Sequence, residues 1–391
     1  MFVDVAGPSF IFWPVGCGDT TTIVVSESEV VQIDINDKLM ADEQGNEHIP
    51  IVDELVSKLP KRDGKPYLSC FVLTHPDLDH CRGFKDLLKR VTIGEIWHTP
   101  RIFLENGPDL NDEALSFRAE ARRRAKLTID AAGDPGAGNR VRIIGYSDHF
   151  QPGKRFYGFP DQFKTRPGSS ITVIDGADVS DRFHAFVHAP FKEGLANDRN
   201  ETSLAMRVIV GTTDFALHGL FLGDLSYPTI MQIFEETHAH GNDRMLEWHV
   251  LLAPHHCSKK VMYERDDFGS DVLKQDVLDE LSACQLDIGY IVASSNEFPH
   301  SNNSGDNPPH RKARNRYGEI VNTAFVCTGE FSTPEDVRPI IFTATAAGMV
   351  LAGDDYQMSE SAENTLAAAI AAARGTNAPP ATKVGFGTNE V

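Results

Sequence analysis

The segment 74–83, THPDLDHCRG, concentrates side chains that can do chemistry. Two imidazoles and two carboxylates stand within six positions of it, at His75, Asp77, Asp79 and His80. Nitrogen and carboxylate donors of this kind are typical ligands of transition metals. Because a loop can turn several side chains towards one point, the segment predicts a metal site; a polar surface turn is the alternative.

Two further apolar runs also end in possible ligands. FLGD, residues 221–224, ends in Asp224, and LLAPHHCSK, residues 251–259, contains the adjacent His255 and His256. A Gly-Asp pair alone is common in turns. However, α/β folds gather functional side chains at one edge of a sheet, so three apolar runs that stop at ligands predict one shared site.

The pattern around these motifs predicts a layered α/β fold, because apolar runs alternate with amphipathic segments along most of the chain. YLSCFVLTH, residues 67–75, is almost wholly apolar and predicts a strand buried on both faces that ends at His75. The expected strands are 10–16, 20–25, 30–35, 67–75, 93–98, 171–175, 202–210, 214–224, 248–256, 287–294, 323–327 and 338–345. The expected helices are 49–59, 82–89, 111–129, a segment after Tyr227, 272–281 and 310–317.

The composition fits one large globular domain or two of ordinary size. The chain has 391 residues, of which 41% are hydrophobic and 24% charged, and this excludes a disordered or fibrous protein. Lysine and arginine total 37 against 56 aspartates and glutamates, so the formal charge is -19. A field of that sign repels polyanions, so a nucleic-acid partner would have to be held locally by a metal or a basic patch.

The N-terminus, the length of the apolar runs and the cysteines indicate the cellular compartment, and the composition along the chain indicates its domains. No basic segment precedes an apolar run at the N-terminus, and no apolar stretch approaches the ~20 residues of a membrane span. We therefore expect a soluble, cytoplasmic protein without a membrane partner. Six cysteines without a CxxC pair predict reduced, buried thiols. The expected organisation is one domain over 1–345, with an insertion or lid at about 100–170, and an Ala/Gly-rich tail over 346–391.

In their order, the motifs resemble those of the metallo-β-lactamase superfamily, and most of all the hydrolase domain of ComEC-type DNA-uptake proteins. The resemblance covers about residues 10–330 and implies a four-layer αββα metallo-β-lactamase sandwich. Asp77 stands where the commoner loop, HxHxDH, has its second histidine, and Cys257 replaces the glycine usual after the two histidines. The matching segments are VGCGDTTTIVV, VVQIDI with Asp34, HPDLDH, NETSLAMRV with Asn200 and Ser203, GD and PHHCSK.

The resemblance implies two divalent metal ions, zinc or manganese, and a role for each motif residue. One metal would be held by His75 and Asp77, the other by Asp79 and His80, with Asp224 as the bridge and His255 as a further ligand. His256 would be an outer group or the acid that protonates the leaving oxygen, so that Asp79, Asp224 and His256 form the catalytic set. Residues behind the metals or facing the substrate would be Asp34, Asn200, Ser203, Lys259, His300 and His310.

The charge of such a site indicates its substrate. Two divalent cations outweigh the carboxylates of Asp77, Asp79 and Asp224, which leaves a positive focus inside an acidic protein. This favours a small or locally presented anion, such as a phosphodiester, and a metal-bound water with a pKa near ~7 as the nucleophile. We therefore predict a phosphodiesterase or nuclease that acts on a nucleic acid or on a smaller anionic molecule. Alternatives are an ester, thioester or lactone hydrolase, a di-iron redox protein, and a catalytically silent, metal-stabilised partner of another protein.

Overall fold

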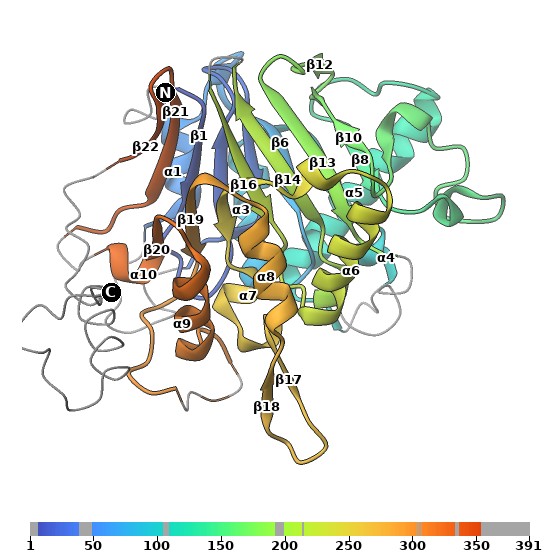
Figure 1. The fold of residues 1–391 in the computed structure, drawn as a ribbon. Helices are drawn as coiled ribbons and strands as arrows, with labels where there is room; N and C mark the ends of the chain where they lie inside the picture. The colour runs from blue at the N-terminus through green and yellow to red at the C-terminus, as the bar shows by residue number, and fades with distance from the viewer. Residues whose placement is uncertain are drawn as a thin grey trace, which may run out of the picture. The chain divides into compact units, whose positions relative to one another are not determined.

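Two large β-sheets form the centre of the structure, a computed structural model (Figure 1). It describes residues 7–38, 49–104, 109–191, 199–212, 215–302, 305, 307–332 and 336–352. The strands of the first sheet are, in spatial order, β22 (Gly348–Leu351), β21 (Ile340–Thr345), β1 (Ser9–Phe12), β2 (Thr21–Val24), β3 (Val30–Ile33), β6 (Lys65–Leu73), β7 (Thr92–His98), β8 (Arg140–Ile144) and β9 (Lys164–Thr165), with β5 (Lys61–Arg62) paired to β6.

The second sheet has seven strands among the described residues. Its strands are, in spatial order, β10 (Ser170–Ile171), β13 (Phe183–Ala189), β14 (Ala205–Gly211), β15 (Ala216–Phe221), β16 (Trp248–Leu252), β19 (Gln285–Ala293) and β20 (Ala324–Cys327). The inner faces of the two sheets meet through aromatic side chains. Phe10 of β1 packs edge-on against Phe221 of β15, with ring centroids 5.6 Å apart, and Trp97 of β7 lies 6.4 Å from Phe183 of β13.

Helices cover the outer face of each sheet. The first sheet is covered by α1 (Ile51–Lys58), α3 (Phe84–Arg90) and α5 (Asp112–Ala131), and Phe84 of α3 packs 4.9 Å from Phe71 of β6 and 5.0 Å from Phe117 of α5. The second sheet shares one buried apolar cluster with α6 (Tyr227–Ala239), α8 (Gln275–Ala283) and α9 (Arg311–Ile320). The four-layer αββα sandwich is therefore confirmed (Figure 1). None of the described helices is both long and apolar enough to cross a bilayer.

The strands that precede the motifs run parallel within each sheet. In the first sheet β3, β6 and β7 are parallel neighbours, and in the second β15, β16 and β19 are. Parallel strands bring their carboxyl ends to one edge of a sheet. Asp34 follows β3, His75 follows β6, Asp224 follows β15 and His255 follows β16, so both sheets deliver ligand candidates to their carboxyl edges.

The predicted insertion differs from the structure in one respect. Residues 100–170 contain the long helix α5 and the strand β8, which pairs in parallel with β7, so part of the segment belongs to the sandwich itself. The stretch between β8 and β9 is mostly irregular backbone, and there Phe150, Phe156 and Phe159 pack on one another. The antiparallel hairpin of β17 (Tyr263–Arg265) and β18 (Asp271–Leu273) was not predicted, and it extends away from the sheets (Figure 1).

The chain divides into a unit of residues 1–350 and a unit of residues 351–391. β22 continues the first sheet to Leu351, beyond the domain end expected at 345. Most of the predicted tail, from residue 353 onwards, lies outside the described residues.

Candidate metal centre

Asp34 holds the HPDLDH loop from behind. It is fully buried, and its backbone has the left-handed φ of 53° at the end of β3. Its carboxylate accepts hydrogen bonds from the backbone N–H of Thr74, at 2.8 Å, and from the Thr74 hydroxyl. The same carboxylate lies 2.7 Å from Nδ1 of His80. Asp34 thus ties the start of the loop to the histidine at its end.

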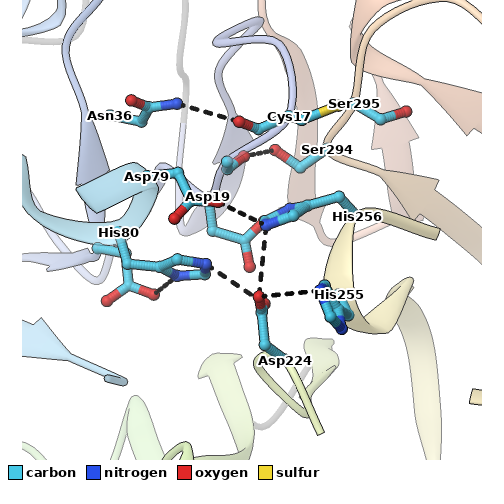
Figure 2. Close-up of polar contacts among 12 residues, drawn as sticks. Cys17, Asp19, Asn36, Asp79, His80, Asp224, His255, His256, Ser294 and Ser295 are labelled. Atoms are coloured by element: carbon cyan, nitrogen blue, oxygen red, sulfur yellow. Dashed lines mark hydrogen bonds and ion pairs between the residues drawn. The ribbon is translucent and has the colours of Figure 1, made fainter. Parts of the chain in front are cut away.

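His75 and His80 are buried, and both present Nε2 to Asp224. His80 Nε2 lies 3.3 Å from Asp224 Oδ1, and His75 Nε2 lies 3.8 Å from Asp224 Oδ2. The two rings are close neighbours, with centroids 4.0 Å apart. The loop therefore delivers two imidazoles to one carboxylate from the other sheet, as Figure 2 shows for His80.

The Gly-Asp turn after β15 is built to place Asp224. Gly223 has a φ of 55°, and a Cβ atom there would stand 2.7 Å from the Cβ atom of Ser203, so both conformation and space favour glycine. The Ser203 hydroxyl accepts a hydrogen bond of 3.3 Å from the backbone N–H of Asp224. Ser203 is fully buried, so its contact is with the Asp224 turn.

The PHHC turn after β16 brings both adjacent histidines to the same carboxylate. His255, His256 and Cys257 have consecutive left-handed φ values of 50°, 52° and 64°. The backbone N–H of His255 donates to the carbonyl of Gly223 at 3.0 Å, which joins this turn to the Gly-Asp turn. Nε2 of His255 lies 3.8 Å from Asp224 Oδ2 and Nε2 of His256 lies 3.5 Å from it (Figure 2).

Asp19 joins the cluster although the sequence analysis gave it no role. It is buried, and its Oδ1 lies 3.3 Å from His256 Nδ1 (Figure 2). Its backbone N–H donates to the carbonyl of Asp79, and the preceding Gly18 has no room for a side chain beside Asn36. The signal was present in the VGCGD segment, where a carboxylate directly precedes a strand.

Two histidines of the cluster share one arrangement. Asp34 faces Nδ1 of His80, Asp19 faces Nδ1 of His256, and each ring turns its Nε2 towards Asp224. A carboxylate on one imidazole nitrogen fixes the tautomer and orientation that leave the other nitrogen free to bind a metal. His256 Nε2 also lies 3.2 Å from Asp79 Oδ2, so the ring faces two carboxylates on its inner side.

The interior of the cluster fits a divalent cation. Single donor atoms of Asp19, His80, Asp224 and His256 all lie within 4.8 Å of one another, and all four residues are buried. Several donor atoms that face this space have no hydrogen-bond partner among the described residues, including the Nε2 atoms of His75, His80 and His256 and Oδ1 of Asp224. Buried polar atoms without partners are costly, so a ligand that binds nitrogen and oxygen donors would stabilise this arrangement.

The protonation of the cluster follows burial and charge. Burial lowers the pKa of His75 to about 3, which keeps its imidazole neutral and able to bind a metal. Burial acts the same way on His80 and His256, but the surrounding carboxylates, Asp224 first among them, together outweigh it and raise the pKa of both rings. Those same rings hold the pKa of Asp224 well below its usual range, although burial alone would raise it.

The exposed side of the cluster is formed by three predicted ligands. The side chains of Asp79, Asp77 and His255 are 37%, 29% and 15% exposed, whereas His75, His80 and His256 are buried. Asp77 Oδ2 lies 3.8 Å from His75 Nε2, and its Oδ1 lies 3.2 Å from an Arg199 guanidinium nitrogen. Asp77 is therefore within reach of the cluster, but its carboxylate also forms an ion pair with Arg199.

Four further residues were predicted behind the metals or at the substrate, namely Lys259, His310, Asn200 and His300. The Lys259 ammonium pairs with Asp271 of β18 at 3.1 Å. His310 is buried, accepts a hydrogen bond from the backbone N–H of Lys259 and donates its own backbone N–H to the carbonyl of Cys257, so it braces the PHHC turn. Asn200 lies half-buried in the short helix Asn200–Thr202, and His300 is exposed.

Comparison with known proteins finds similarity to solved structures. No protein-family model and no curated protein matches the chain. The metallo-beta-lactamase fold protein YhfI from Bacillus subtilis is 13% identical, with a TM-score of 0.38 over 82% of this chain and 96% of that chain. ST1585, an archaeal metallo-beta-lactamase superfamily protein from Sulfolobus tokodaii, is 11% identical, with a TM-score of 0.28 over 81% and 96%. By its own layers and sheet order, the chain is a four-layer αββα sandwich, the architecture that the resemblance of its motifs implies.

Proposed function

We propose that the protein is a metal-dependent hydrolase with a dinuclear site, and that its substrates are phosphodiesters. The observation that carries the proposal is the convergence on Asp224. Imidazoles from the HPDLDH loop and from the PHHC turn lie 3.3 to 3.8 Å from its carboxylate oxygens, within a buried cluster. A carboxylate between two pairs of histidines is suited to bridge two cations.

The ligand set proposed for these cations has a buried part and an exposed part. The buried part consists of Asp224 and the Nε2 atoms of the four histidines. The exposed part consists of the carboxylates of Asp77 and Asp79. When bound, the metals would act as Lewis acids and lower the pKa of a bound water to ~7, which supplies a nucleophile at neutral pH. The mixed nitrogen and oxygen donors suit zinc or manganese.

The chain itself orients these ligands and limits the access of water. Asp34 and Asp19 hold His80 and His256 with Nε2 turned inwards. The position of His256, between Asp19, Asp79 and Asp224, supports a ligand role for this ring, in preference to the leaving-group acid that the resemblance allowed. The exposed carboxylates of Asp77 and Asp79 leave one side open to a substrate.

A phosphodiester is favoured over a neutral ester by the cations beside the open side. Arg199 pairs with Asp77, and Lys260 lies near enough to His255 for its charge to help burial lower the pKa of that ring. The formal charge of -19 works against a long polyanion, so a nuclease role of the ComEC type would need contacts close to the site. Ester, thioester and lactone hydrolysis remain the alternative chemistry on the same metals.

Metal analysis coupled to hydrolysis tests the proposal. The purified protein should contain up to two equivalents of zinc or manganese and should hydrolyse bis(p-nitrophenyl) phosphate when either ion is supplied. Asp224→Ala should lose bound metal and lower kcat/KM by more than about a hundredfold, since even outer partners of metal ligands contribute about 10- to 100-fold. Asp267→Ala, at an exposed hairpin position, is the matched control and should change neither quantity.

The same variant separates an enzyme from a binding protein. A catalytically silent scaffold would show no turnover in the wild type with either ion, and Asp224→Ala would still bind its protein partner. If the wild type has neither bound metal nor turnover, the hydrolase proposal is wrong.

A further inference from the structure

Arg199 contacts the cluster from its exposed side. One guanidinium nitrogen lies 3.2 Å from Asp77 Oδ1 and donates to the backbone carbonyl of Asp109, also at 3.2 Å. The side chains of Arg199 and Asp77 are 33% and 29% exposed, so the pair lies at the open side of the site, where a substrate would enter. Arg199 was not predicted from the sequence, whereas the predicted Lys259 is neutralised by Asp271.

The charge balance of Asp77 explains why an arginine stands here. The carboxylate of Asp77 forms an ion pair with Arg199, which neutralises part of the charge of both side chains. Once Asp77 gives part of its negative charge to a metal ion, as proposed above, Arg199 has less of its own charge neutralised. A guanidinium has five N–H donors, and in this structure one nitrogen both forms the ion pair with Asp77 and donates to the carbonyl of Asp109.

The other guanidinium donors of Arg199, which have no partner among the described residues, suit one kind of ligand. Their planar fork matches two oxygens of a phosphate, and charge-assisted hydrogen bonds of this kind are about twice as strong as neutral ones. A neutral ester offers no such pair of charged oxygens. An arginine next to the ligands of a hydrolytic site therefore discriminates between anionic and neutral substrates.

We propose that Arg199 binds the non-bridging oxygens of the substrate phosphate and is the residue that selects anionic esters at this site. The proposal rests on the proposed function, because it names the part of the substrate that this site holds. Arg199 pairs with Asp77 before the substrate binds, and it contacts the substrate afterwards.

Steady-state kinetics of Arg199→Gln test this role. The KM for bis(p-nitrophenyl) phosphate should rise about tenfold or more, as expected for a lost hydrogen bond to a charged group. The KM for p-nitrophenyl acetate, a neutral ester, and the bound metal should not change. Arg199→Lys, which keeps the charge but loses the fork, should lie between the two. Arg244→Gln removes an exposed arginine in Asp243–Leu246 and is the matched control.

Binding of inorganic phosphate to the metal-loaded protein, measured by calorimetry, gives a readout that needs no turnover. Phosphate should bind the wild type and Arg244→Gln equally, and Arg199→Gln about tenfold or more weakly. Equal phosphate binding by Arg199→Gln and the wild type, or no binding by either, overturns the role of Arg199. A loss of metal or a lower Tm in Arg199→Gln also overturns it, because Arg199 would then only hold Asp77.

The two proposals fail in different ways. If the wild type cleaves no phosphodiester but binds phosphate through Arg199, the proposed function is wrong and the anion site stands. If the wild type cleaves phosphodiesters and Arg199→Gln has an unchanged KM for them, the hydrolase stands and the role of Arg199 is wrong.

Discussion

At Asp224, one carboxylate receives imidazoles that arrive from two different sheets. The rings of His80 and His256 are each backed by an aspartate that the chain places far from the motif it supports. Asp34 and Asp19 are both buried, so their contacts with the histidines are little screened by solvent. At the scale of single residues, the site therefore depends on the orientation of the ligands as much as on their identity.

Asp19→Asn tests this dependence. The substitution keeps the size of the side chain but removes the negative charge that faces His256 Nδ1. We expect about 10- to 100-fold weaker metal binding, as for other outer partners of metal-binding histidines. Competition with a chromophoric chelator measures the affinity, and Asp267→Asn, at an exposed position, should leave it unchanged. A wild-type affinity in Asp19→Asn would contradict an orienting role for Asp19.

At the scale of elements, the PHHC turn is the most unusual piece of backbone in the site. Its three consecutive left-handed residues let two adjacent histidines reach the same carboxylate oxygen. Residues with a Cβ atom pay roughly 1–2 kcal/mol in this conformation. The turn is held by the carbonyl of Gly223 on one side and by the backbone N–H of His310 on the other. Packing of neighbouring elements thus maintains a conformation that the local sequence disfavours.

Cys257 allows the strain to be measured. It has a φ of 64° and is fully buried in the apolar cluster of the second sheet. Cys257→Ala keeps the conformational penalty and leaves a small cavity, so it should be destabilised. Cys257→Gly removes one more carbon but relieves the penalty, and we expect it to be about 1 kcal/mol more stable than Cys257→Ala. Urea unfolding of the metal-free variants measures the difference, and a less stable Cys257→Gly would contradict a strained turn.

At the scale of the whole molecule, two buried histidines that are not among the proposed metal ligands couple stability to pH. Burial lowers the pKa of His98 and of His188 to about 4. His98 packs between the rings of Phe103 and Phe117, and His188 Nε2 lies 2.9 Å from the carbonyl of Met245. In the unfolded chain, both imidazoles take up protons near pH 6.5.

Stability should therefore fall on acidification between pH 6.5 and pH 4. In that window the unfolded chain binds protons that the folded protein does not, so the free energy of unfolding decreases as the pH falls, by about 2 to 3 kcal/mol for each histidine. Below pH 4 both states are protonated and this loss is complete. His188→Gln should flatten the pH dependence in urea unfolding of the metal-free protein. His240→Gln, at an exposed position, should leave the slope unchanged.

Much of the fold could be predicted because its strands are short apolar runs with clear ends. The strand predicted at 67–75 is β6, Lys65–Leu73, and the helix predicted at 111–129 is α5, Asp112–Ala131. The hairpin of β17 and β18 was missed, because its strands are short and mostly half-exposed and so carry no apolar pattern. The role of β8 in the sheet was missed because the glycine- and proline-rich residues around it suggested a lid.

The sequence alone determined which side chains could bind a metal and that strands would carry them, since both follow from residue types and from patterns among near neighbours. Only the tertiary structure decided that Asp19 completes the cluster, that His256 faces Asp79 and Asp224, and that Lys259 turns to Asp271. These contacts join residues far apart in the chain, and they depend on left-handed backbone angles that packing imposes against local preference.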